Sequence, residues 1–352
     1  MPRYGFTVLS YIAAVLVLMP FQSHWRARNI ATIALMAWLF IVNLLQGTGT
    51  IIWANTARIV APIYCDVSNL LRVAGGWALP ASALCLTRSL ANVASPNYTP
   101  TDLDGKRKRF WFEITMCVFM PFVYAGLHYI TRENRFHIIE DFGCQVDTYF
   151  SWVAIWLVYI PSLTISIISA VHVGIAMYWL TQRRAQRAEL FFVSHSGLTT
   201  TRYFRLMALG LTEVIIDLGV NLYVFISKIS LNPIQPWVSW EYVRHRISTT
   251  SQSNDASISP GVKLRLVAMS TIPITTAFAF FMFFAFGEEA VADYKRNWTL
   301  VKIYIFQLEP SITPREYRGP TFFLCVPFSR EQGFKFAWLT LCLIIEKPRG
   351  RC

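Results

Sequence analysis

Three polar residues recur at four-residue intervals within one apolar stretch: Glu213, Asp217 and Asn221. Residues four apart lie on one face of a helix, so these three should share a face. Arg72 lies inside another apolar stretch, and its long side chain could reach Asp217 or Asn221. Charged residues inside a membrane are costly and usually face a partner or the bundle interior. We therefore expect a polar contact between Arg72 and this face.

Asn43 and Gln46, in a further apolar stretch, could join the same polar network. Three roles are open for such a network. It could form the floor of a ligand cavity, it could hold a resting state, or it could be a purely structural contact.

The sequence holds no pattern typical of an enzyme. No HExxH, P-loop or GxSxG motif occurs. The six histidines are dispersed, and the one well inside an apolar stretch, His172, has the ordinary role of a helix contact. Lys263 lies at the edge of its apolar stretch, whereas a retinal protein needs a lysine deep inside the last one. We expect no catalytic residue, no metal site and no cofactor.

Two of the seven cysteines lie where oxidation is favoured. Cys65 stands just before an apolar stretch, and Cys144 lies in the loop between two others. We expect both outside the cell, where disulfides persist, and predict that they are bonded. No CxxC pair occurs, so the cysteines give no zinc signature.

The elements that must position these residues are membrane-spanning helices. Of the 352 residues, 54% are hydrophobic and only 15% are charged, against roughly 45–50% and about a quarter in soluble domains. A run of about 20 apolar residues crosses a bilayer. The sequence predicts an all-α membrane protein, a seven-transmembrane helix bundle, with spans at about 4–21, 30–53, 66–90, 111–130, 151–180, 206–229 and 264–287.

Loop charge predicts the orientation of the bundle. The loops after the first, third and fifth spans are rich in Lys and Arg, whereas the loop after the fourth also carries several carboxylates. Basic loops stay in the cytoplasm, so we expect the N-terminus outside and the C-terminus inside the cell. The glycosylation sequons at Asn97 and Asn297 would then be cytoplasmic and unmodified. This rule also accounts for the net charge of +12 without a nucleic-acid partner.

Two parts are expected along the chain: a transmembrane domain over 1–287 and a cytoplasmic tail over 288–352. The tail is atypical after about residue 309, because 334–345 is an apolar run too short to span a bilayer. This run could lie on the membrane surface, or it could be a translated intron or frameshift.

Several segments resemble one family of fungal receptors, the lipopeptide (a-factor type) pheromone receptors of the mating-type system. The main ones are HWRARN at 24–29, LCLTRSLANV at 84–93, DFGCQ at 141–145 and PWVSWEYVRHRIS at 236–248. TTTRYFRLMAL at 199–209 and FGEEA at 286–290 add support.

The resemblance implies a multi-pass G-protein-coupled receptor of the plasma membrane. Its ligand would be a farnesylated peptide pheromone, and its cytoplasmic partner a heterotrimeric G protein. A transporter or channel without G-protein coupling is the alternative, and it would need a continuous polar path. A receptor-like scaffold without a ligand, and a homodimer, are also left open.

The resemblance also gives roles to residues at both ends of the bundle. Trp237, Trp240, Glu241 and His245, in the last outer loop, could contact the peptide, although the aromatic rings could instead anchor at the interface. Together with Arg72, Asp217 and Asn221 they form the candidate ligand-binding set. The family's basic inner-loop arginines, expected to couple to the G protein, map onto Arg88, Arg183, Arg184, Arg187, Arg202 and Arg205.

Overall fold

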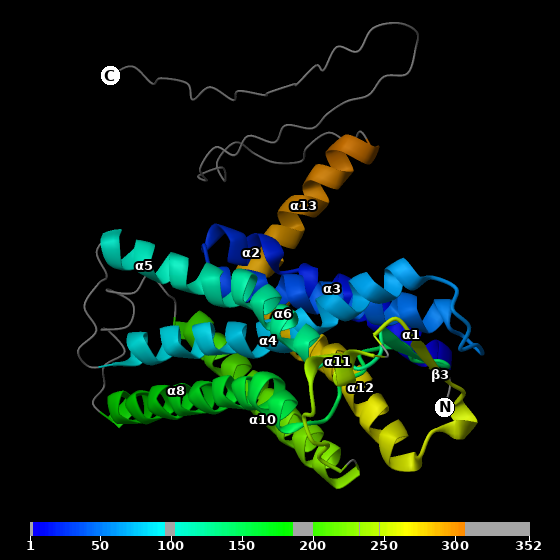
Figure 1. Cartoon of the computed structure of the whole chain (residues 1–352). Helices are drawn as coiled ribbons and strands as arrows, with labels where there is room; N and C mark the ends of the chain where they lie inside the picture. The colour runs from blue at the N-terminus through cyan, green and yellow to red at the C-terminus, as the bar shows by residue number, and fades with distance from the viewer. Residues whose placement is uncertain (1–2, 96–102, 186–199, 232, 246, 307–352) are drawn as a thin grey trace, which may run out of the picture. The chain divides into compact units, whose positions relative to one another are not determined.

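The computed structural model describes residues 3–95, 103–185, 200–231, 233–245 and 247–306 (Figure 1). The chain divides into two compact units, Met1–Lys295 and Arg296–Cys352. The described part of the second unit is the end of helix α13 (Glu288–Phe306). Everything below concerns the first unit.

Seven helical segments of the described chain are long and apolar enough to cross a membrane, and each covers one predicted span apart from at most a few residues at the ends of that span. The predicted number and positions of the spans are therefore confirmed. The segments are α1 (Arg3–Leu18) with α2 (Phe21–Arg26), α3 (Ile30–Ile52), α4 (Pro62–Ala94), α5 (Leu103–Ile114) with η1 (Thr115–Phe119) and α6 (Met120–Ile130), α7 (Trp152–Ala154) with η2 (Ile155–Tyr159) and α8 (Ile160–Ala185), α10 (Thr200–Leu231), and α12 (Pro260–Phe284).

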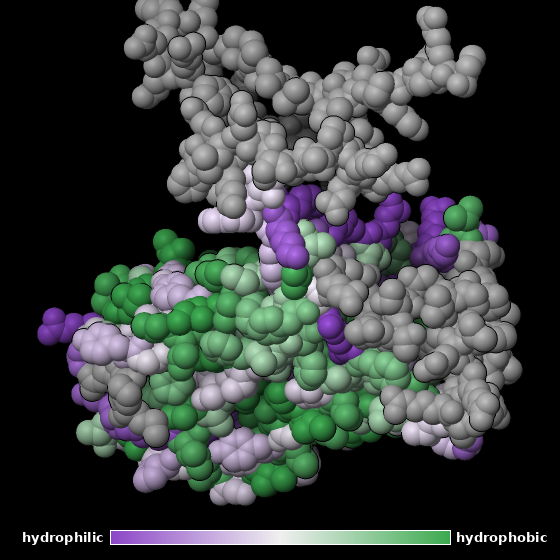
Figure 2. Space-filling view, turned by 180° about the vertical axis from the view of Figure 1, so that it is seen from behind, coloured by the Kyte–Doolittle hydropathy of each residue, from purple (hydrophilic) through white to green (hydrophobic). Residues whose placement is uncertain are grey.

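Apolar residues cover both the inside and the outside of the bundle. The core includes Leu35, Leu209 and Phe280, none of which is more than 1% exposed. Large apolar side chains such as Trp156 and Ile215 point outward. Figure 2 shows hydrophobic residues over the middle of the face that it draws, with hydrophilic ones toward the margins. This distribution suits a bundle surrounded by lipid, in which α4 packs against α3, α6, α8 and α10.

Two prolines inside the spans follow π-helical segments. Pro121 comes after η1, and Pro161 comes after η2. Proline lacks an N–H, so Pro121 cannot donate to the Cys117 carbonyl four residues earlier. The Trp38 indole Nε1–H, from α3, donates to that carbonyl instead, at 2.9 Å. A neighbouring helix thus satisfies the backbone group that the proline leaves open, as membrane helices require.

A small sheet, which the sequence did not predict, lies at one end of the bundle. Strand β1 (Phe136–Ile139) pairs antiparallel with β2 (Gly143–Gln145), placing Ile138 opposite Cys144. It also pairs in parallel with β3 (Thr250–Ser253). The loop after span four therefore joins the loop after span six. We call the described parts of 131–151 and 233–259 the loop cap, and this end of the bundle the cap end.

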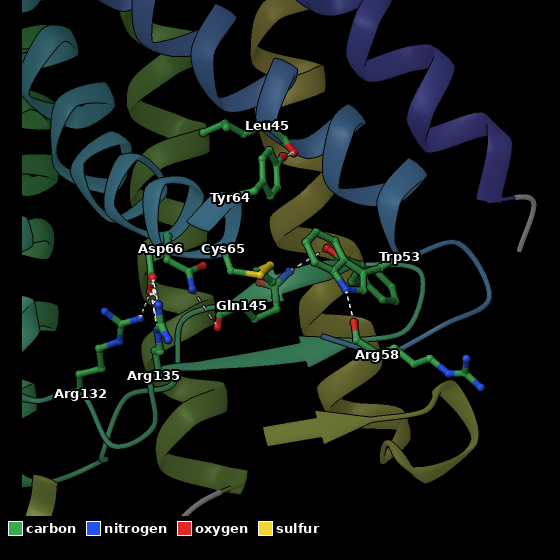
Figure 3. The surroundings of a disulfide bond; sticks show 12 residues. Leu45, Trp53, Arg58, Tyr64, Cys65, Asp66, Arg132, Arg135 and Gln145 are labelled. Carbon is green, nitrogen blue, oxygen red and sulfur yellow. Dashed lines mark hydrogen bonds and ion pairs between the residues drawn. A yellow bond between two sulfur atoms is a disulfide. The ribbon is translucent and has the colours of Figure 1, made fainter. Parts of the chain in front are cut away.

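The loop cap is fastened to the helices by a disulfide bond between Cys65 and Cys144, whose Cα atoms lie 5.4 Å apart (Figure 3). Next to it, the Asp141 N–H donates to the Trp53 carbonyl at 3.0 Å. Gly143 has a φ of +75°, and a Cβ there would lie 3.3 Å from the backbone of Gly49. The DFGCQ segment thus places a glycine where only a glycine fits well, directly before the bonded cysteine.

We expect Cys65→Ser to destabilise the protein, because the bond closes a separation of 79 residues. Chain entropy sets an upper value of about 4.5 kcal/mol, and the membrane-inserted helices already restrain the chain, so the loss should be smaller. Thermal unfolding of the purified protein measures the loss, and peptide mapping without reductant should find the linked peptides. Cys85→Ser, at a cysteine outside the bond, should leave the linkage intact. Two freely alkylated thiols at 65 and 144 would contradict the bond.

Candidate functional site

An ionic clasp lies beside the disulfide bond. Asp66, at the start of α4, accepts a hydrogen bond from Arg135 Nη2 at 2.6 Å, and Arg132 Nη2 lies 3.7 Å from the same carboxylate (Figure 3). Hydrogen bonding to Asp66 raises the pKa of Arg135, whereas burial lowers the pKa of Arg132. Exposed ion pairs contribute roughly 0–1 kcal/mol, so the disulfide is the main attachment of the loop cap.

His137 joins the first and third strands of the cap. Its Nε2 lies 2.8 Å from the Ser253 hydroxyl, so this side-chain contact joins the two parallel strands β1 and β3. Burial lowers the pKa of His137, so the ring is neutral at physiological pH. Its contribution to stability is retained above the unfolded pKa of about 6.5 and is lost as the pH falls, because the buried ring would have to accept a proton.

The aromatic residues predicted in the last outer loop lie in the loop cap. The Trp237 ring lies 6.5 Å from the Tyr149 ring, whose hydroxyl donates to the Pro236 carbonyl at 3.0 Å. Trp240 begins the short helix α11 (Trp240–Arg244), where Ser239 accepts a hydrogen bond from the Tyr242 N–H. These rings are thus attached to the start of span five and to a capped helical turn.

Arg244 is a residue of this surface that sequence reasoning missed. Its guanidinium carbon lies 4.6 Å from the centroid of the Trp240 ring and 4.4 Å from that of Tyr129, at the end of α6. Each such contact is worth about 0.5–1 kcal/mol at exposed sites. The sequence does contain a signal for this contact, because Arg244 lies four residues after Trp240 and residues four apart share one face of a helix. Glu241 and His245 are exposed on the same short segment.

Arg72 is placed differently from the prediction. Its Nη2 donates to the Gln46 Oε1 of α3 at 2.8 Å, and the nearby Tyr64 hydroxyl donates to the Leu45 carbonyl at 2.7 Å. Within the described part of the chain, no ion pair joins Arg72 to Asp217, and no hydrogen bond joins it to Asn221. The expectation that Gln46 belongs to the network of Arg72 is confirmed.

The polar face of α10 turns toward α8 instead. Asn221 accepts a hydrogen bond from the Ser162 hydroxyl at 3.0 Å and donates to the Ser166 hydroxyl at 3.2 Å. Glu213, four residues before Asp217, is fully buried, and its carboxylate has no hydrogen-bond partner among the described residues.

The described contacts between α4 and α10 lie away from both Arg72 and Asp217. Helix α10 contacts α4 at the other end of α4, where the Tyr203 hydroxyl lies 3.3 Å from the Leu90 carbonyl. Leu90 is 18 residues, or about 27 Å, beyond Arg72 on α4, and Tyr203 is 14 residues, or about 21 Å, before Asp217 on α10. Spans three and six are neighbours, as expected, but Arg72 and Asp217 do not meet.

At the opposite end of the bundle, the structure describes only some of the arginines predicted to couple to a G protein. Arg88 is exposed, and its guanidinium carbon lies 4.3 Å from the Phe112 ring centroid on α5. Arg205 packs against the turn after span seven, where a side chain at Gly287 would overlap it. Three other predicted arginines, whose side chains are not described, belong to α8 and α10: Arg183, Arg184 and Arg202. Arg187 lies outside the described residues.

The HWRARN segment attaches the first loop of this end to the last span. The buried His24 ring lies 4.6 Å from the Phe284 ring, and Arg26 Nη2 lies 2.5 Å from the carboxylate of Asp293. Asn29 caps α3 by accepting a hydrogen bond from the Thr32 N–H. The segment therefore turns the chain from span one into span two while holding it against α12 and the start of α13.

The chain matches the STE3 family, described as pheromone A receptor, over residues 5–303. The match covers all seven candidate spans. The chain belongs to this family.

Individual members of the STE3 family agree with this assignment. The chain is 38% identical over 299 residues to the pheromone B beta 1 receptor of Schizophyllum commune, covering 84% of this chain and 55% of that protein. It is 32% identical to pheromone receptor 1 of Ustilago hordei, covering 84% and 82%, and 24% identical to the pheromone M-factor receptor of Schizosaccharomyces pombe, covering 78% and 73%. The chain thus spans about half the length of the first relative and most of the other two.

For this STE3 family member, the segments that carried the resemblance now have structural roles. DFGCQ supplies the disulfide and the tight turn of the loop cap, and PWVSWEYVRHRIS supplies its aromatic surface. HWRARN links spans one, two and seven at the opposite end. The motifs therefore lie at the two ends of the bundle, where ligand and partner would meet a receptor.

Proposed function

We propose that this chain is a G-protein-coupled receptor for a farnesylated peptide mating pheromone, and that it signals to a cytoplasmic heterotrimeric G protein. The observation that carries the proposal is the family match across all seven spans. A receptor of this kind is not an enzyme. It acts by a shift between bundle conformations that ligand and G protein both favour.

The cap end suits an amphipathic ligand. A farnesyl chain needs apolar contacts, whereas a peptide needs hydrogen-bonding groups and aromatic surface. Trp237, Trp240, Glu241 and His245 lie on the loop cap, and we propose that they contact the peptide. Arg72 lies below them on α4. Asn221 bonds to Ser162 and Ser166 of α8, so a role in holding the helices together suits it better than direct ligand contact. Asp217 lies one turn before it on α10.

We propose that the cap end is extracellular and that the C-terminal end is cytoplasmic. Two independent features support this orientation. The disulfide at the cap end requires an oxidising compartment. The loops of the opposite end carry dense basic runs such as Lys106–Arg109, whereas the loop cap mixes its arginines with carboxylates such as Glu140 and Asp147.

Terminal tags test the orientation. A tag placed before Arg3 should be removed by protease on intact cells, whereas a tag at the C-terminus should be protected until the cells are opened. Permeabilised cells provide the control that both tags can be cleaved. A protected N-terminal tag would reverse the proposed topology.

A yeast strain that lacks its own pheromone receptor but keeps the G-protein pathway tests the function. The full chain is expressed there and exposed to a panel of farnesylated, carboxymethylated peptides, with the same peptides lacking farnesyl as the control. At least one farnesylated peptide should activate a pathway reporter, and its unmodified form should not. A correctly inserted chain that answers no farnesylated peptide would count against the proposal.

Arg88 should matter for coupling more than for ligand binding. It is exposed at the end of α4 opposite the cap, where a partner could reach its charge. Arg88→Ala should reduce the maximal reporter response about tenfold or more. Pheromone affinity should change only a few-fold, because a bound G protein itself raises that affinity and the variant would lose this contribution. Lys106→Ala, at an exposed cation of the same end, serves as the matched control. Lost pheromone binding with normal surface expression would assign Arg88 to ligand binding or folding instead.

A further inference from the structure

One face of α4 links the loop cap to the buried arginine. Cys65, Asn69 and Arg72 are spaced by four and three residues and so lie on the same side of the helix. Cys65 is bonded to Cys144, and the Asn69 Nδ2–H₂ donates to the carbonyl of the next residue, Gln145, at 3.5 Å. Arg72 follows about 5 Å beyond Asn69, and so about 10 Å beyond Cys65, along the helix axis. The strand held by the disulfide therefore lies directly above the polar pair of Arg72 and Gln46.

Three buried polar atoms on this face and its neighbour lack a partner. Arg72 Nε, Gln46 Nε2 and Asn69 Oδ1 have no hydrogen-bond partner in the part of the chain that the structure describes. Gln46 and Asn69 are only 4% and 3% exposed. Buried polar groups in native proteins nearly always have partners, and each one without costs about 1–3 kcal/mol. Two unused donors and one unused acceptor in one place indicate that a group from outside the chain completes them.

The charge of Arg72 also indicates that a partner from outside the chain is missing. A guanidinium has five N–H donors and no acceptor, and Gln46 is the neutral group that accepts from it. Among the described residues, no carboxylate forms an ion pair with Arg72. A cation inside a membrane span without a counter-charge is expensive. Guanidinium groups bind carboxylate and carbonyl oxygens best, so the missing partner is an acceptor oxygen.

We propose that Arg72, Gln46 and Asn69 bind the polar end of the lipidated cysteine of the ligand. The Arg72 Nε–H and the Gln46 Nε2–H₂ donate to a carbonyl or carboxylate oxygen, and Asn69 Oδ1 accepts an amide N–H. This site rests on the proposed function, and it specifies which part of the pheromone is bound inside the bundle. An S-farnesylcysteine unit offers this chemistry, because an acceptor oxygen, an amide N–H and an apolar chain lie within one residue.

Small probes test the site without knowledge of the pheromone sequence. N-acetyl-S-farnesylcysteine and its methyl ester are titrated against the full chain, purified in lipid nanodiscs, and binding is followed by thermal stabilisation and by direct equilibrium measurement. N-acetylcysteine methyl ester without farnesyl is the ligand control. The wild-type chain should bind the methyl ester, the form that the proposed pheromone carries, as well as the free acid, because both present a carbonyl oxygen to Arg72.

The variants separate this site from the rest of the cap end. Arg72→Gln should weaken binding of the acid roughly 10–100-fold, as expected for a lost hydrogen bond to a charged group, and weaken the ester less. Gln46→Leu should weaken both probes about equally. Arg135→Gln removes an arginine that already pairs with Asp66 at the same end, and it should change neither affinity by more than about twofold. Should Arg72→Gln fail to fold, Gln46→Leu and Asn69→Ala still test the site.

Each result has one meaning. Unchanged affinity for both probes in folded Arg72→Gln and Gln46→Leu would overturn the site while leaving the receptor proposal intact, provided that the yeast reporter still answers a farnesylated peptide. Probe binding that is lost equally in Arg135→Gln would assign the effect to general charge and would also overturn it. Absence of binding to the wild-type chain, together with a silent reporter, would overturn both the site and the proposed function.

Discussion

The disulfide bond between Cys65 and Cys144 determines where the loop after span four can lie, and the rest of the cap end follows from that position. The bond brings β2 to the start of α4, β2 aligns β1, and β1 provides the edge on which β3 of the next loop pairs. The Asp66 clasp and the His137 hydrogen bond are individually weak. They orient loops whose positions the covalent bond has already restricted, and neither contact would hold the two loops together alone.

Inside the bundle, the corresponding constraint is the absence of water. A backbone carbonyl that a proline leaves open needs a partner from a neighbouring helix, as when Trp38 donates to the Cys117 carbonyl. Asn43 also donates across the bundle, to the Pro273 carbonyl of span seven. These contacts tie α3 to span four and to span seven. Helix α3 therefore holds its neighbours at several depths, and Gln46, one turn beyond Asn43, is presented to Arg72 from a firmly placed helix.

The features that depend on composition and on the length of apolar runs could be predicted from the sequence. Long apolar runs predicted the seven spans, and the outer location of two cysteines predicted their pairing. Features that depend on the pairing of distant segments were missed or misplaced. The strands are three or four residues long and join loops more than a hundred residues apart, so no local pattern marks them. Arg72 was assigned to Asp217 by depth alone, but depth does not give the rotation of α10, which turns its polar face to α8.

Helix α4 offers a physical route between the two ends of the receptor. Arg72 and Arg88 lie on this one helix, 16 residues or about 24 Å apart, with Pro80 midway between them. A helix interrupted by a proline can change its bend at small cost, because one hydrogen bond of the ladder is already missing there. A ligand group bound to Arg72 and Gln46 would act on the part of α4 before Pro80, whereas a partner that reaches the exposed Arg88 would act on the part after it. Both contacts can therefore bias one bend, which is the minimum that a two-state signal requires.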